Sequence, residues 1–478
     1  MVFHGLRSIF DHSHMRTADG GVRKKRTCGL LFPEGLTLEL IAPSRVGVRA
    51  VLFAIVASGF AHAVLADWND IATQGAKEGT AWAYRVDAIA AVYSSRDAWF
   101  GASESFLGLR IDHWADIGFD AGLSFEKKLG DGTFFSELGG VYTSTSGDDA
   151  SGSTVGLTDT SALTLEQARV GWKAADLFEG IENDTLSITV GRQSYNIGTG
   201  LLINDGGADG AENGGWYLGL RTAFSESLVA SLDSDRWLVE GFRLKNRPRL
   251  GGTQGEALGA NAEYKLDEST RIGGTWMQAD SNVPGDAELD IFSARAEWKG
   301  GVALGVAGEY VDESSSQIAA TGYYLEIRSF LNGSEVPIVS YRYAHFDGDD
   351  PATAKDERFR EIAYGFADWG AWYQGEITGQ YALGNGNLVS HRLRFTQETD
   401  ASTLNVLYYK LSLDEPAGFG VTSKDWGDEL DVTIDWQAAE RLLVTGVLGA
   451  LVPGDAAEQY AGGSDHWLHA MAYVKYSF

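Results

Sequence analysis

The sequence is poor in cysteine, proline and basic residues. It has one Cys and eight Pro in 478 residues, and 38 Lys and Arg against 66 Asp and Glu, for a formal net charge of −28. The only cysteine, Cys28, lies in a region that we expect to be removed, which excludes a disulfide or a thiolate metal site from the mature chain. A chain this acidic, without a basic tract in its mature part, is a poor nucleic-acid binder, so we expect no nucleic-acid partner.

Long apolar runs are also missing beyond the N-terminal region, which excludes a transmembrane helix there. The mean hydropathy is near neutral. An outer-membrane β-barrel has the same average, because half of each strand faces a polar lumen. Hydropathy therefore does not separate a soluble protein from a membrane barrel.

The N-terminal region has the order of a secretory signal peptide. Arg45 and Arg49 precede the apolar run 50–60, and the small residues Ala63 and Ala66 follow it. Cleavage after Ala63 or after Ala66 fits this order equally well. Residues 1–40 lie upstream of the signal and reflect either a start codon assigned too early or a long signal n-region. We expect residues 1–66 to be removed and residues 67–478 to form a single domain.

The final stretch, 466–478, alternates strictly between two faces. One face is wholly apolar and the other is mixed: the first carries Leu468, Ala470, Ala472, Val474, Tyr476 and Phe478, and the second carries Trp467, His469, Met471, Tyr473 and Lys475. Such a strand fits a wall between lipid and water. The edge of a soluble sheet is the alternative, but a long unpaired strand promotes aggregation, and closure into a barrel removes it.

Similar alternating segments recur from about residue 81, without heptads or a helical period. Our count comes to about twenty, and single-chain outer-membrane barrels have even strand numbers. The pattern is ambiguous near 81–112 and 225–244, where Trp237 and Val239 compete with Leu238 and Phe242 for the lipid face. The sequence thus predicts an all-β fold, a transmembrane antiparallel β-barrel.

Connection lengths support this fold. If Phe478 lies on the periplasmic side, connections should alternate between short periplasmic turns and longer extracellular loops. The expected short connections are 437–440, 398–402, 367–370, 331–334, 299–301 and 266–269, and the long ones are 453–465, 413–427, 346–357, 280–288 and 245–256. The tight turn 384–387 is an exception on the outer side. Residues 67–80 are too few for a plug, so we expect any constriction to come from folded-in loops.

The chain resembles the alginate export family of outer-membrane barrels. The likeness is clearest at Tyr364–Ile377 (YGFADWGAWYQGEI), and it continues at Asn385–Leu388, His391–Arg394, Leu407–Asp414 and Pro453–Glu458, with a weaker match at Val190–Gln193. The resemblance implies an 18-stranded barrel with an arginine-rich lumen that passes a polyanionic uronate polymer.

Strand parity places a set of arginines opposite the apolar faces, and hence in the lumen. They are Arg85, Arg110, Arg221, Arg271, Arg295, Arg328, Arg342, Arg392 and Arg394. Guanidinium groups stay charged and donate forked hydrogen bonds to carboxylates, which suits transient binding of a uronate chain. The same parity places carboxylates inward: Asp87, Asp112, Asp120, Glu126, Glu263, Glu297, Glu309, Glu326 and Glu376. Cross-strand ladders that brace the wall are therefore an equally good interpretation.

Enzyme and metal classes find little support. His466 and His469 have metal-like spacing on a helix, but on a strand they face opposite ways. The nucleophile motif Gly-x-Ser-x-Gly is absent. The loop 204–210 lacks the spacing of an EF-hand calcium site, so a mobile outer loop is the better interpretation. Most aromatics, including Trp298, Trp369, Trp372, Trp436, Tyr341 and Tyr343, fit interfacial girdles. Sugar stacking is an option for an inward ring such as Tyr324. We expect no catalytic residues, metal or cofactor.

The expected function is an outer-membrane channel that exports an anionic exopolysaccharide such as alginate. The alternative is a porin for uptake of small anionic solutes or oligosaccharides, and a barrel enzyme ranks third. We expect a monomer that contacts outer-membrane lipid and lipopolysaccharide, with periplasmic polysaccharide-secretion proteins as further partners. The acidic excess should lie in outer loops such as 147–149, 347–350 and 425–429.

Overall fold

A computed structural model describes most of the region after the expected signal peptide. The described residues are 79–150, 159–174, 186–207, 212–247, 255–280, 288–300, 304–330, 337–365 and 372–478. The predicted signal peptide, the domain boundary at residue 66 and Trp369 lie outside them.

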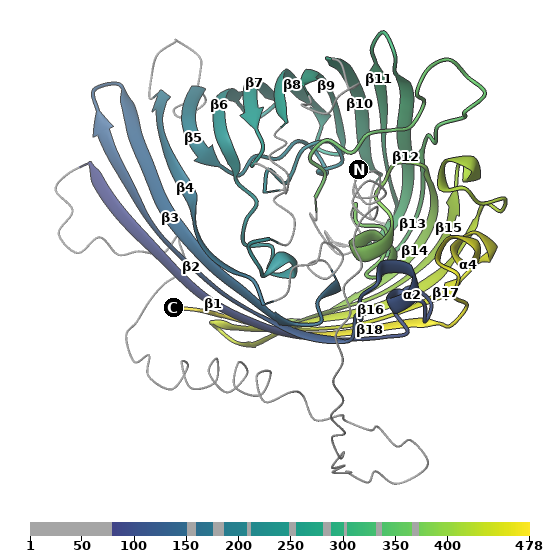
Figure 1. Cartoon of the computed structure of the whole chain (residues 1–478). Helices are drawn as coiled ribbons and strands as arrows, with labels where there is room; N and C mark the ends of the chain where they lie inside the picture. The colour runs from purple at the N-terminus through teal and green to yellow at the C-terminus, as the bar shows by residue number, and fades with distance from the viewer. Residues whose placement is uncertain are drawn as a thin grey trace, which may run out of the picture.

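The described residues form one closed barrel of eighteen antiparallel strands (Figure 1). Every strand pairs with its neighbour in sequence, and β1 closes the ring on β18, from Asp87 opposite Ser477 to Arg96 opposite Leu468. The strands are β1 (Thr80–Arg96), β2 (His113–Leu129), β3 (Gly132–Gly147), β4 (Ser161–Ala174), β5 (Leu186–Gln193), β6 (Phe224–Asp233), β7 (Trp237–Lys245), β8 (Glu256–Asp267), β9 (Thr270–Asp280), β10 (Leu289–Gly300), β11 (Leu304–Ser314), β12 (Ala319–Phe330), β13 (Pro337–Phe346), β14 (Leu388–Glu398), β15 (Ser402–Leu413), β16 (Asp425–Ala439), β17 (Leu442–Pro453) and β18 (Trp467–Ser477). The predicted all-β barrel of 18 strands is confirmed.

Helices occur only as short turns in the described connections. They are α2 (Ser103–Leu107), α4 (Asp455–Ala461), the 3-10 turns η1 (Trp216–Leu218) and η3 (Pro416–Phe419), and the π-helical turn η2 (Thr378–Ala382). None of the described helices is long and apolar enough to span a membrane. At the outer end of the barrel α2 and α4 lie side by side (Figure 1), where the Phe106 and Tyr460 rings are 5.2 Å apart.

The two faces of the wall differ as the alternation predicts. Large apolar side chains such as Leu325, Leu393 and Leu468 point outward and are exposed, whereas Trp467 and His469 on the other face are buried in the interior. The ambiguity in β7 is resolved: Trp237 and Val239 are exposed on the outer face, and Phe242 is buried inside. This apolar outer belt, together with closure of the sheet, identifies an integral outer-membrane barrel.

The belt gives a first prediction. Leu325→Arg, in the middle of β12, should destabilise the barrel by about 2–4 kcal/mol, because it places a charge near the bilayer midplane. Leu468→Arg, at the outer end of β18, should cost only about 0–1 kcal/mol, because its charge reaches the interface. Urea unfolding in lipid vesicles measures the free energy of unfolding of both variants. Equal losses of stability would contradict the assignment of these outward residues to different depths in the bilayer.

The predicted alternation of connection lengths is largely confirmed. Turns at 130–131, 268–269, 399–401 and 440–441 lie at the end of the barrel where Phe478 lies, and the connections at the other end are mostly longer. The outer connection 315–318 is short, contrary to the rule.

The count of about twenty strands was wrong at the longest connection. Residues 347–387 form a single connection between β13 and β14, and the described part of it contains no strand. The expected periplasmic turn 367–370 lies outside the described residues. The described residues on either side of it form no strand, which explains why the count of about twenty exceeded eighteen. The turn 384–387 is the last part of this connection, so it lies on the outer side without breaking the alternation.

Candidate solute pathway in the lumen

The inward face carries seven of the nine predicted arginines. They are Arg85 on β1, Arg271 on β9, Arg295 on β10, Arg328 on β12, Arg342 on β13, and Arg392 and Arg394 on β14. The other two lie in connections rather than on strands, contrary to the parity prediction. Arg110 lies in the connection before β2, with an exposed side chain paired to Asp112, because the chain has not yet entered the strand there. Arg221 lies in the connection before β6 and is buried.

Strand register places several of these arginines in common rows, which the sequence does not fix. Glu326 lies opposite Arg342, and Arg342 lies opposite Arg392. The next row joins Arg328 to Ser340 and Ser340 to Arg394. Neighbouring strands β12 to β14 therefore carry a dense patch of guanidinium groups around one carboxylate.

Most of these arginines are ion-paired within the wall. Arg295 Nη2 lies 2.7 Å from Glu263 Oε1, Arg328 Nη1 lies 2.6 Å from Glu297 Oε1, and Arg392 Nη2 lies 2.7 Å from Glu326 Oε1. The half-exposed Arg271 lies 3.7 Å from Glu263, and Arg394 Nε donates to Thr396 and Asn405. These contacts match the bracing ladders described above.

Arg342 contacts a ring that comes from a loop. Its guanidinium carbon lies 4.4 Å from the centre of the Trp372 ring, which also packs 4.8 Å from Tyr324. Trp372 is 1% exposed. It was expected in an interfacial girdle, and it was misplaced because its segment was taken for a strand. The Tyr324 ring is covered by Trp372, so it offers no open stacking face.

The described parts of two connections fold inward and meet in the lumen (Figure 1). In the first, 194–223, Arg221 Nη1 donates to Thr143 Oγ1 on β3 at 2.5 Å. In the second, 347–387, Trp372 Nε1 donates to Thr199 O of the first at 3.0 Å. Since Trp372 also packs on β12 and β13, the two connections together join opposite sides of the eighteen-stranded ring. The loop predicted at 204–210 belongs to the first connection, and its described part packs inside, where Asn204 N donates to Ala363 O at 2.8 Å.

Wall carboxylates hold the second connection at η2. Glu429 accepts the Ile377 N–H at 2.6 Å and the Thr378 N–H at 2.9 Å, and Asp431 accepts the Glu376 N–H at 3.1 Å. Gly375 has a φ of 99°, and a Cβ there would lie 2.5 Å from the Glu429 carboxyl carbon, so only glycine fits. Glu429 was expected in an acidic outer loop, but it is on β16 and fully buried.

Glu376 makes this attachment sensitive to pH. Burial, together with the neighbouring Glu429 carboxylate, raises the pKa of Glu376 to about 8 from a usual 4.5. The state in which this connection is attached to the wall therefore binds more protons than the detached state. The stabilisation of the attached state is full below about pH 4.5 and is lost as pH rises through about 8. We expect conductance fluctuations in planar bilayers to increase between pH 6 and pH 9.

Glu376→Gln should flatten that pH dependence. Glu357→Gln, on the outer part of the same connection, should leave it unchanged. An unaltered pH profile in Glu376→Gln would contradict the assignment.

A cavity of about 220 Å³ lies in the wall formed by the first strands. It is lined by Arg85, Gly122, Glu137, Gly139, Gln167, Arg169 and Ser194. Arg85 Nη2 lies 2.5 Å from Asp120, and Arg169 makes two bonds to Glu137, at 2.9 and 2.5 Å. Both arginine side chains are 30% exposed.

Arg169 was missed by the sequence prediction because β4 contains a bulge. Gly139 pairs with Gln167 while Gly140 pairs with Leu165, so Glu166 is an extra residue in β4. The alternation changes phase there: Leu163 and Leu165 face outward before the bulge, and Val170 faces outward after it. Simple parity across 161–174 therefore assigns Arg169 to the wrong face.

A closed eighteen-stranded barrel with an apolar outer belt, a charged lining and inward connections defines an outer-membrane β-barrel. Solved structures with this fold include Pseudomonas aeruginosa OccK5 (OpdH), at a TM-score of 0.52 and 10% identity, covering 83% of this chain and 98% of that one. P. aeruginosa OpdK with vanillate matches at a TM-score of 0.51 and 13% identity, covering 83% of this chain and 98% of that one. P. aeruginosa OprD matches at a TM-score of 0.51 and 12% identity, covering 83% of this chain and 93% of that one. At these low identities, the structural similarity shows a shared fold alone.

No protein-family model matches the chain, and no curated protein matches it. The expected membership of the alginate export family is therefore not confirmed. The structural similarity is to the outer-membrane proteins named above instead.

Proposed function

We propose that the protein is a selective outer-membrane channel for the passive uptake of small anionic solutes such as organic acids. The observation that carries this proposal is the fixed crossing of the lumen by connections 194–223 and 347–387. Buried contacts attach both connections to the wall and to each other. A narrow, preformed passage suits a small solute better than a polymer chain.

The cavity at Arg85 and Arg169 supports selection of carboxylates. Each guanidinium already lies against wall carboxylates, and each side chain is 30% exposed, so a solute carboxylate can bind there weakly and leave again. OpdK, which shares the fold, was solved with vanillate, an aromatic carboxylate, which makes vanillate a suitable probe. Because the pathway lies within one closed chain, we also infer that a monomer is the working unit.

Polysaccharide export has less support. The resemblance that suggested it is strongest at 364–377, and the described residues of that segment belong to the inward connection that narrows the lumen. The lumen arginines that were expected to guide a polymer are mostly paired with wall carboxylates.

Transport measurements test the proposal. In liposome swelling and planar bilayers, we expect vanillate and other small carboxylates to permeate or to block current at millimolar concentration, and oligouronates to do neither. Arg85→Gln with Arg169→Gln should weaken the carboxylate effect severalfold, because the exposed charges are lost. Arg110→Gln, outside the lumen strands, is the matched control. Passage of long uronate chains, or equal responses to carboxylates and amines, would overturn the proposal.

A further inference from the structure

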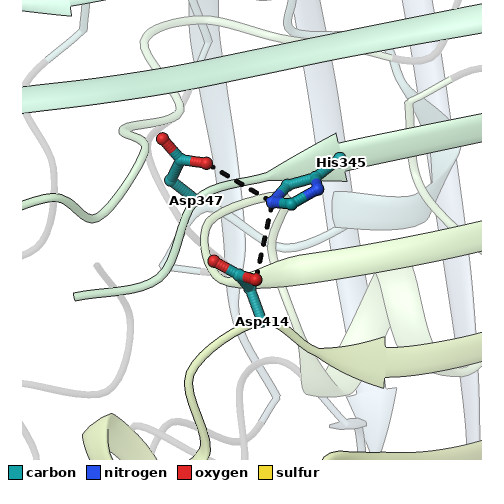
Figure 2. Close-up of side chains that lie close together, drawn as sticks. All are labelled: His345, Asp347 and Asp414. Carbon is teal, nitrogen blue, oxygen red and sulfur yellow. Dashed lines mark ion pairs between the residues drawn. The ribbon is translucent and has the colours of Figure 1, made fainter. Parts of the chain in front are cut away.

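A histidine and two aspartates converge where β13 and β15 end (Figure 2). His345 is the penultimate residue of β13, Asp347 follows the end of that strand, and Asp414 follows the end of β15. His345 Nε2 lies 3.3 Å from Asp347 Oδ1 and 3.5 Å from Asp414 Oδ1. One ligand atom from each residue lies within 4.8 Å of the others.

These separations suit ligands around a small cation better than hydrogen bonds. An N–H···O bond usually measures about 2.9 Å, and the buried Nε2 has no partner with hydrogen-bond geometry, although it lies within ion-pair distance of both carboxylates. Zinc binds imidazole nitrogen and carboxylate oxygen at about 2.0–2.2 Å, which in a tetrahedron places neighbouring ligand atoms about 3.3–3.5 Å apart. The two observed distances match that spacing.

Each ligand is oriented by a second contact on its far side. Asp347 Oδ2 accepts the Thr321 N–H and hydroxyl, both at 2.7 Å. Asp414 Oδ2 accepts the Gly348 N–H at 2.9 Å, which leaves both Oδ1 atoms facing the histidine. His345 Nδ1 lies 3.3 Å from Tyr323 Oη. In the tautomer that donates from Nδ1 to this hydroxyl, the Nε2 lone pair points at the carboxylates. Partners of this kind hold metal ligands in place.

We propose that His345, Asp347 and Asp414 bind a divalent transition-metal ion of the zinc class, with water in the fourth position. One imidazole and two carboxylates suit zinc or cobalt, whereas calcium takes six to eight oxygens. The ligand side chains are 21 to 27% exposed, so an ion can enter from solvent. Its charge would balance the two carboxylates.

The site would fasten the root of the inward connection 347–387. The Asp347 carbonyl accepts the N–H groups of both Phe359 and Asn387, each at 3.0 Å, so this residue joins the start of the connection to its end. A metal at Asp347 therefore links this junction to β13 and to the end of β15.

Cobalt titration tests the proposal on tag-free protein treated with EDTA and held in detergent. We expect the visible absorption of tetrahedral cobalt to saturate at a single equivalent and to disappear when zinc is added. The unaltered protein suffices for this test, so a folding defect in a variant cannot hide the result. Absence of the band from the unaltered protein would mean that the histidine only forms an ion pair with the two aspartates, and would overturn the proposal.

Variants locate the ion. His345→Gln and Asp414→Asn should lose the cobalt band and the rise in heat-unfolding temperature that zinc gives the unaltered protein. His391→Gln is the matched control, because His391 Nδ1 also lies against a tyrosine hydroxyl, Tyr341 Oη at 2.8 Å. Heat-dependent migration on SDS gels checks that each variant is folded. A band that persists in folded His345→Gln would assign the cobalt to an adventitious site and reject this one.

Discussion

Replacing residues 372–383 with a short Gly–Ser linker is expected to raise single-channel conductance severalfold. This segment carries Trp372, which joins the two inward connections, and η2, which is held by Glu429. Tyr381 in the same segment also packs against Tyr217 and Trp467, at ring distances of 5.2 and 6.0 Å. Its removal detaches the second connection from the first and from the wall, which widens the narrowest part of the passage.

A replacement elsewhere in the same connection provides the control for this experiment. Residues 351–355 are exposed, and replacing them with a linker of equal length should leave the conductance unchanged. Planar-bilayer recordings of the three proteins, after gel shift confirms folding, give the comparison. If removing 372–383 leaves the conductance as it was, the constriction lies elsewhere and the proposed uptake role loses its main support.

Glu326→Gln is expected to be the most destabilising single change in the lumen. Arg392 lies 2.7 Å from this carboxylate with a side chain that is 2% exposed, Arg328 lies 3.4 Å away, and Arg342 is its neighbour across the strand pair. Removing the carboxylate leaves buried guanidinium groups without their common counter-charge. The free energy of unfolding should fall by about 3–5 kcal/mol.

Glu297→Gln is a matched control for this prediction. Glu297 also pairs with Arg328, at 2.6 Å, but its side chain is 51% exposed, and an exposed pair contributes less than about 1 kcal/mol. Urea unfolding in lipid vesicles, followed by tryptophan fluorescence, measures both variants. Equal losses would show that burial does not decide the strength of these pairs.

The sequence by itself determined the fold class, because strand alternation is a local property. Each side chain on a strand takes the face opposite to that of its neighbour, so apolar residues at every second position identify a lipid-facing wall without knowledge of partners. Leu468 outside and His469 inside follow from this rule, as do the inward positions of Arg342 and Arg392. Short and long connections likewise agree with the premise that Phe478 lies at the end of the barrel that carries the short turns.

Only the tertiary structure decided what the lumen contains. The rule of alternation fails where an extra residue shifts the phase, as at Glu166 before Arg169. It also fails where a segment with an apolar pattern packs inside the barrel, as with Trp372. Ion pairs such as Arg392 with Glu326 join residues far apart in sequence, and the cluster of His345, Asp347 and Asp414 joins the ends of two strands. Such contacts depend on strand register and on loop packing, which are set by the whole closed ring and which no local pattern encodes.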